Sequence, residues 1–155
     1  MQIARKIAVG VLWFLGVSGL VGAVPLLLFP HGKPWGFMSQ SLLRYSPFHS
    51  YLIPGIILFI ANGCLCMLVL YATQRRWTGY GWLVAFQGCV AAGWIVVEVI
   101  MLRTLSWAHL LYFAVGLGLI VSGLALTRDT SAGHEKSPKS WLLRGQPRAA
   151  AAAEM

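Results

Sequence analysis

Residues 81–102 read GWLVAFQGCVAAGWIVVEVIML, and Glu98 is the only charged side chain in this run. An α-helix rises about 1.5 Å per residue, so about 20 apolar residues cross the ~30 Å hydrocarbon core of a bilayer. The apolar residues here form one continuous block instead of alternating with polar ones. The run therefore predicts a helix that crosses a membrane.

Three more apolar blocks lie elsewhere in the chain, at about residues 7–29, 47–73 and 106–126. Of the 155 residues, 58% are hydrophobic and 10% are charged, whereas about a quarter are charged in an ordinary soluble domain. A mean hydropathy of +0.72 argues in the same direction. We therefore predict an all-α fold, a four-helix transmembrane bundle formed by residues 1–127.

The two ends of the chain need separate interpretation. The first apolar block follows Arg5 and Lys6, as a signal peptide would, but the apolar part of a signal peptide is usually about 7–15 residues long. An uncleaved helix is therefore favoured over a signal peptide. Residues 128–155 are basic and show no apolar periodicity, so we predict a disordered cytoplasmic tail.

The positive charges predict the orientation of the bundle. The short connections after the second and third blocks make neighbouring helices antiparallel, which predicts an up-down topology. Cytoplasmic loops carry an excess of Lys and Arg, so we expect both termini in the cytoplasm and a multi-pass protein of a bacterial inner membrane. The basic residues on the cytoplasmic side then account for the net charge of +8, and we predict no nucleic-acid partner. Nine of the twelve basic residues fall on the cytoplasmic side: Arg5, Lys6, Arg75, Arg76, Arg128, Lys136, Lys139, Arg144 and Arg148.

Local signals predict where helices begin and bend. Ser46 and Pro47 suit the N-cap and first helical position of the second span, and Ser106 suits the N-cap of the fourth. Pro54 lies inside the predicted second span and should kink it, because proline removes a backbone hydrogen bond. Residues 30–50, between the first two spans, suggest a short helix lying in the membrane interface.

Glu98 is the only acidic residue inside a predicted span, where a carboxylate needs water, a partner or a proton. Gln87 stands 11 residues before it, close to three helical turns, and Ala91 and Trp94 lie on the same stripe. This face should look into the bundle. Asn62 is the other deep polar residue, and we predict that Asn62 and Gln87 make polar contacts between helices.

The residues near Glu98 suggest a ligand pocket in the outer half of the bundle. The side chains could bind a metal, act as an acid–base pair, or merely face lipid headgroups while Glu98 pairs with Arg103 or a tyrosine. No metal-binding motif is present, so we predict no metal and no cofactor. The pocket candidates are Glu98, His109, Tyr112, His49 and Trp94, with His31 as a further neighbour.

Small residues at a spacing of four suggest close helix packing, within one chain or between two copies. Cys64 and Cys66 are two residues apart, so on a helix their side chains point in different directions and cannot form a disulfide. The cysteines therefore suggest no redox role. The small pairs are Ser18/Gly22, Gly19/Ala23, Gly88/Ala92, Cys89/Gly93 and Gly118/Ser122, and the cysteines are Cys64, Cys66 and Cys89.

Two stretches carry a resemblance to a known group of proteins: SPFHSYLIPG at residues 46–55 and GWIVVEV at residues 93–99. They resemble uncharacterised small bacterial four-span membrane proteins, and the resemblance extends over about residues 7–126. It implies a fold and a location, and no catalytic residue can be carried over.

The sequence alone assigns no activity, and it favours an accessory or structural membrane protein over an enzyme. One alternative is binding or isomerisation of a hydrophobic ligand in a pocket around Glu98. Another is a small oligomeric transporter that uses Glu98 for proton coupling. We expect membrane lipids as partners, and the sequence leaves open a second copy or another membrane protein.

Overall fold

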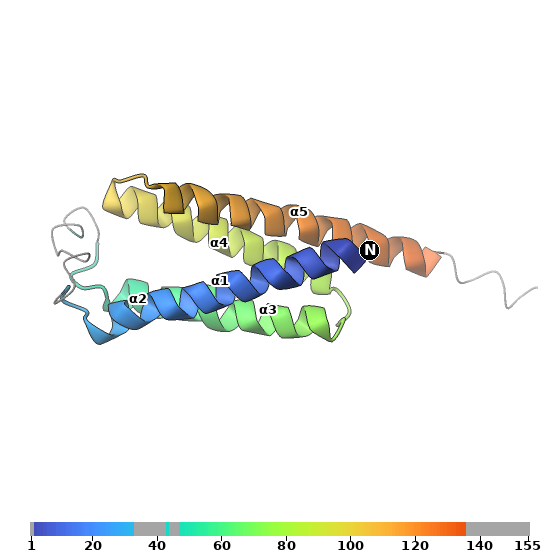
Figure 1. Cartoon of the computed structure of the whole chain (residues 1–155), viewed down its shortest axis with the longest axis horizontal. Helices are drawn as coiled ribbons and strands as arrows, with labels where there is room; N and C mark the ends of the chain where they lie inside the picture. The colour runs from blue at the N-terminus through green and yellow to red at the C-terminus, as the bar shows by residue number, and fades with distance from the viewer. Residues whose placement is uncertain (1, 33–42, 44–46, 136–155) are drawn as a thin grey trace, which may run out of the picture.

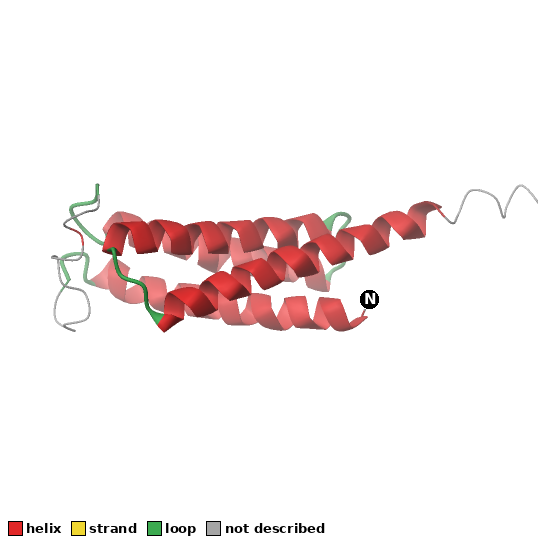
Figure 2. Cartoon of the chain, turned by 90° about the horizontal axis from the view of Figure 1, so that it is seen from above, coloured by secondary structure: helices red, strands yellow, loops and turns green. Residues whose placement is uncertain are grey.

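The computed structural model describes residues 2–32, 43 and 47–135, which form helices and the loops between them without any strand (Figures 1 and 2). The helical elements are α1 (Gln2–Leu28), α2 (Leu52–Leu58), the π-helical segment η2 (Phe59–Cys64), α3 (Leu65–Gln74), α4 (Tyr80–Leu102) and α5 (Trp107–Glu135). Because α2, η2 and α3 follow one another directly, they form one long helix.

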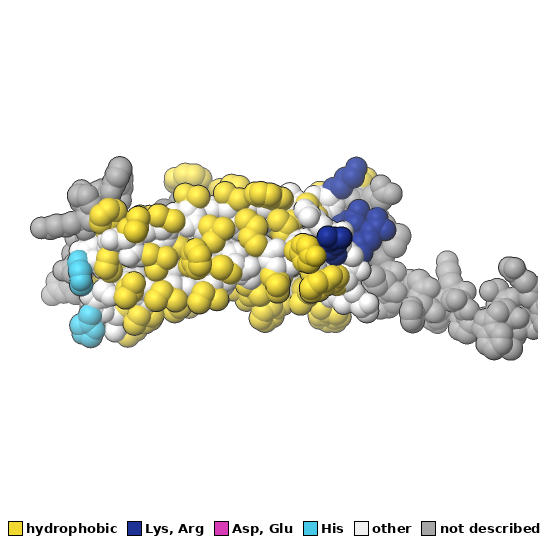
Figure 3. Space-filling model, turned by 90° about the horizontal axis from the view of Figure 1, so that it is seen from below, with side chains coloured by type: hydrophobic (Ala, Val, Ile, Leu, Met, Phe, Trp, Pro, Cys, Tyr) yellow, Lys and Arg dark blue, Asp and Glu magenta, His cyan; other side chains and the backbone are white. Residues whose placement is uncertain are grey.

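Among the described residues, four helical segments are long and apolar enough to cross a membrane, at Ile3–Leu28, Leu52–Gln74, Tyr80–Leu102 and Trp107–Arg128. Large apolar side chains point outward from the bundle, with Ile100 67% exposed and Val121 68% exposed. Figure 3 shows such side chains between a basic end and an end that carries histidines. For the described residues, the predictions of an all-α fold and of four helices long and apolar enough to span a membrane are therefore confirmed.

The helices pack as two closely associated groups. α4 lies along α5, which is the most extensive contact between elements, and α1 lies against α2, η2 and α3 (Figure 1). α1 also contacts α5, and α3 contacts α4, so the two groups close into one bundle. The core between them includes Leu12, Val69, Val84 and Leu119, all fully buried.

Glycines allow α4 and α5 to approach closely. A Cβ atom on Gly88 would lie 2.6 Å from the carbonyl oxygen of Gly116, and one on Gly123 would collide with the backbone nitrogen of Ala85. The predicted packing role of Gly88 is therefore confirmed. Gly93 and Gly118, by contrast, have open space where a Cβ would stand, so they are not packing contacts within this chain.

The second long helix begins later than predicted. α2 starts at Leu52 and is preceded by Tyr51, so the cap expected from Ser46 and Pro47 is wrong. The backbone N–H of Tyr51 instead donates to the carbonyl of Pro30 at 2.9 Å and ties the two ends of the connection together. Pro54 consequently lies in the first helical turn, where a missing N–H breaks no helical bond, so the physical reason for a proline kink does not apply there.

Two other boundaries differ from expectation. α1 begins at Gln2, so Arg5 and Lys6 lie on the helix instead of before it. α5 continues to Glu135, which corrects the prediction of disorder over residues 128–135. A nucleated helix extends easily through residues that do not break it, and no proline follows Leu126 before Pro138. The rest of the tail lies outside the described residues, and so do residues 33–42 and 44–46 of the segment predicted as an interfacial helix.

Candidate functional site

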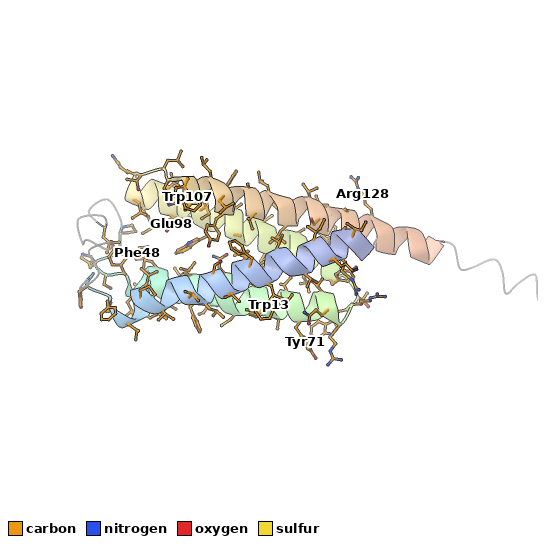
Figure 4. All side chains as sticks on the ribbon, viewed as in Figure 1. Trp13, Phe48, Tyr71, Glu98, Trp107 and Arg128 are labelled. Carbon is orange, nitrogen blue, oxygen red and sulfur yellow. The ribbon has the colours of Figure 1, made fainter. Side chains whose placement is uncertain are left out.

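A cavity of about 150 Å³ lies between the helices, in the half of the bundle where α4 is joined to α5. Figure 4 shows Glu98 in this half. All four long helices contribute to the wall, which combines apolar side chains with a carboxyl, an amide, a phenol and an indole. The lining residues are Leu15, Gly19, Leu58, Asn62, Ala91, Trp94, Ile95, Glu98 and Tyr112.

α4 supplies the largest share of the wall. Ala91, Trp94 and Glu98 line the cavity, and Gln87 is buried further along the same helix. The prediction that this face looks into the bundle is confirmed. Within the part of the chain that the structure describes, no hydrogen bond or ion pair to the Glu98 carboxyl is formed. Glu98 is thus a half-buried acid on the wall of the cavity.

Asn62 is the most deeply buried polar group on the wall. Its side chain is 3% exposed, and neither Nδ2 nor Oδ1 has a hydrogen-bond partner among the described residues. A buried polar group without a hydrogen-bond partner lowers the stability of a protein by about 1–3 kcal/mol. Native proteins therefore rarely leave such a group unpaired. Gly19 lets α1 press against this point, since a Cβ there would lie 2.7 Å from the Asn62 carbonyl oxygen.

The π-helical segment explains where Gln87 bonds. The N–H of Leu65 donates to the carbonyl of Ile60, five residues back, and so does not use the carbonyl of Ala61. Gln87 Nε2 donates to that Ala61 carbonyl at 3.1 Å, and Gln87 Oε1 has no partner among the described residues. Gln87 therefore links α4 to η2 through the residue next to Asn62, and the two amide side chains do not bond to each other.

Tyr112 closes the cavity from α5. Its ring stacks on Phe14 of α1, with centroids 5.8 Å apart and planes inclined by 17°. This stack joins α1 to α5 beside the cavity. Tyr112 therefore has an aromatic packing partner on one side and faces the cavity on the other.

His109 and His49, two of the predicted pocket candidates, are not among the residues that line this cavity. The Nδ1 atom of His109 accepts from the backbone N–H of Ser106 at 3.0 Å and lies 2.7 Å from its Oγ. The imidazole thus reaches back to the residue that precedes α5, which is one half of a capping box. His109 is still close enough to Glu98 for their charges to interact. His49 is exposed in the loop before α2 because that helix begins only at Leu52.

No metal site is formed by the described residues, in which no three His, Cys, Asp or Glu side chains come together. His31 is exposed and is not part of the wall. The three cysteines are free, and Cys66 donates from Sγ to the Leu12 carbonyl at 3.3 Å. The apolar wall residues Leu15, Leu58 and Ile95 carried no sequence signal, because such residues occur throughout a membrane helix.

Comparison with protein-family models, curated proteins and solved structures finds no match to this chain. The site therefore has to be interpreted from its own chemistry. Its wall offers apolar surface to a hydrophobic molecule, together with both donors and acceptors. A molecule that enters with a hydrogen-bonding group could satisfy the Asn62 amide without leaving its apolar part in water.

Proposed function

We propose that this chain is a bacterial inner-membrane protein with an up-down topology and both termini in the cytoplasm. The short connections between consecutive helices support antiparallel neighbours. Figure 1 supports a common side for the termini, because the start of α1 and the far end of α5 lie at the same end of the bundle. Lys and Arg side chains gather at that end in Figure 3, as the cytoplasmic bias of basic residues requires.

Cysteine labelling tests this topology. Arg76 and Leu105 are exposed in the connections at opposite ends of α4. With a membrane-impermeant maleimide added to cells whose outer membrane is permeabilised, we expect Leu105→Cys to react and Arg76→Cys to react only after the inner membrane is opened. The wild-type chain, with its own cysteines inside the spans, is the control. Reaction of Arg76→Cys with the inner membrane intact would contradict the orientation.

We further propose that the protein binds a small lipid-soluble molecule that carries a hydrogen-bonding group. The observation that supports this most directly is Asn62, which is 3% exposed, lines the cavity and has no partner for either amide atom among the described residues. An accessory or structural role, the first expectation from the sequence, leaves that unpaired amide without a reason.

The chemistry of the wall defines the class of ligand. Leu15, Leu58 and Ile95 favour an apolar body, and the Asn62 amide offers one donor group and one acceptor. A cavity of about 150 Å³ is smaller than the ~300–1,000 Å³ pockets that enclose drug-sized ligands. The cavity thus suits one ring or a short chain end, with the remainder of the molecule lying among lipids.

The packing next to the cavity favours binding over transport. Leu12, Val69, Val84 and Leu119 belong to a buried cluster further toward the basic end of the bundle. This cluster is mainly apolar, and it includes no carboxylate or histidine among the described residues. Proton-coupled transport therefore has less support than binding from the described residues.

Substitution of Glu98 tests the binding proposal. We purify wild-type protein in small bilayer discs, extract the bound lipophilic molecules and quantify them by mass spectrometry. Glu98→Leu should retain at least about tenfold less of the ligand, because a hydrogen bond to a charged group contributes about 1.5–3 kcal/mol, or roughly 10- to 150-fold in affinity. Glu98→Gln, which keeps the shape and one acceptor oxygen, should lie between the two.

The control is Val97→Leu, which changes the neighbouring residue on the outward face of α4. Val97 is exposed, so this variant should retain the wild-type amount of ligand. Equal amounts of the same molecules in wild type and Glu98→Leu would show that they bind elsewhere on the protein. An extract with no enriched molecule would leave only the accessory role.

A further inference from the structure

A second cavity, of about 270 Å³, lies at the basic end of the bundle, far from Glu98. Its wall consists of Arg5, Lys6 and Val9 from α1 and Gln74 from the end of α3. The volume is many times the ~30 Å³ that one water molecule occupies in the liquid. The cavity therefore has room for a hydrated polar group between two helices.

The charges on this wall have no negative partner among the described side chains. Glu98 is the only carboxylate whose side chain the structure describes, and it lies in the other half of the bundle. Arg5 is half-buried while Lys6 is exposed, so the site is partly screened from water. Two cations held together without a counter-charge attract an anion, and the attraction is strongest where water is partly excluded.

The backbone adds to this attraction. α1 begins at Gln2, so its first N–H groups lack helical partners, and the positive end of its dipole lies beside Arg5. The end of α3 carries the opposite partial charge, but Arg75 and Arg76 follow it directly and keep this end positive. Gln74 supplies an uncharged amide donor on the opposite wall.

The neighbouring surface is apolar and carries aromatic side chains. Ile3 and Ile7, on the turns of α1 beside the cavity, are 75% and 54% exposed. Tyr71 and Trp77 pack edge to face with ring centroids 5.8 Å apart, as expected of aromatic residues at a membrane boundary. Figure 4 shows Tyr71 and Arg128 toward this end of the bundle.

We propose that Arg5, Lys6 and Gln74 bind the phosphate group of an anionic phospholipid, whose acyl chains lie along the apolar surface around Ile3 and Ile7. A phospholipid is favoured over a free anion because the cavity adjoins surface that acyl chains can cover. The cytoplasmic leaflet, which carries anionic lipids, would supply the ligand. This site is separate from the cavity at Glu98, so either proposal can fail without the other.

Thermal unfolding of the purified full chain in detergent tests the proposal. Phosphatidylglycerol should raise the unfolding midpoint of the wild type by about 3 °C or more, because a ligand that binds the folded state stabilises it. Phosphatidylcholine, which carries no net charge, should raise it much less. If inorganic phosphate alone gives the full shift, the site binds a free anion and the lipid assignment is wrong.

Two double variants with the same loss of charge identify the site. Arg5→Gln/Lys6→Gln removes the cations of the cavity wall, and Arg75→Gln/Arg76→Gln removes two cations at the same end but outside that wall. Only the first should abolish the shift caused by phosphatidylglycerol. Equal losses in both would show general attraction to the basic end, and an undiminished shift in the first would also overturn the site. Each variant is compared with its own midpoint in lipid-free detergent, so a general loss of stability does not affect the result.

Discussion

Gly123→Leu is expected to separate α4 from α5 and to remove about 3 kcal/mol or more of stability. Gly123 is buried in this interface, where even a single Cβ would collide with the backbone nitrogen of Ala85 and lie 2.6 Å from the carbonyl oxygen of Gly81. Backbone atoms of a helix cannot move aside individually. The two helices must therefore move apart, and the contacts along their whole length weaken.

The loss is large because this pair is the most extensive contact in the bundle. In lipid the attraction between helices comes mainly from close packing, since the lipid tails are as apolar as the side chains. A gap between α4 and α5 would be filled by acyl chains at little cost. The cavity at Glu98 would also lose its wall, because Tyr112 comes from α5 and Glu98 from α4.

Gly118→Leu is the matched control, with the same change five positions earlier on the same helix. A Cβ on Gly118 meets no atom within 4 Å, so the leucine would point into lipid. Both variants gain the same helix propensity, and only the packing differs. We would measure unfolding midpoints in detergent and the amount of protein in the membrane. Equal stability of Gly123→Leu and Gly118→Leu would contradict the described α4–α5 interface.

Helix α4 shows what the sequence predicts well. It was expected at residues 81–102 and occupies Tyr80–Leu102. The apolar run is uninterrupted, and it is bounded by Gly79 with a φ of 79° and Arg103 with a φ of 48°. Because every local preference here agrees with the requirements of a bilayer, the helix and its inward face follow from composition and periodicity alone.

The start of the second helix shows where local signals fail. Ser46-Pro47 is a good cap by itself, yet the helix begins at Leu52 because the preceding residues connect back to Pro30. The prediction for His49 assumed a helix that begins at that cap, and the structure places His49 in the loop before α2, away from the wall of this cavity. A contact between residues far apart in sequence decided the boundary, and no local pattern records it.

The cavity was partly predictable for a related reason. Glu98, Trp94 and Tyr112 stand out because a polar or amphipathic side chain in an apolar span needs surroundings other than lipid. The structure places all three on the cavity wall. The π-helical segment has no comparable signature in the sequence, although Asn62 within it lies close against Gly19 of α1. Asn62 was therefore expected as a helix–helix contact, and its position on the cavity wall was missed.

Asn62→Leu is expected to raise the stability of the ligand-free protein by about 1–3 kcal/mol while it lowers ligand retention. Leucine has nearly the shape of asparagine, so the packing against Gly19 is kept. The substitution removes a buried amide that has no partner for Nδ2 or Oδ1 among the described residues. The desolvation cost of that amide disappears, and so does the group that would bond the ligand.

Gln87→Met is the matched control, because it also replaces a buried amide with an apolar side chain of similar length. Gln87 bonds to the Ala61 carbonyl at 3.1 Å and is not on the cavity wall. Its loss leaves that carbonyl unpaired, so stability should not rise and ligand retention should not change. Unfolding midpoints of delipidated protein and the mass-spectrometric ligand assay measure both quantities.

Opposite signs in the two assays are what identify a binding group. When a residue that serves packing is replaced, the protein loses stability. Any loss of ligand then follows from damage to the fold. When a residue that destabilises the fold is replaced, the protein gains stability. A loss of ligand in that variant cannot be attributed to unfolding. If Asn62→Leu is less stable than the wild type without ligand, the amide has a structural partner and the binding proposal loses its main support.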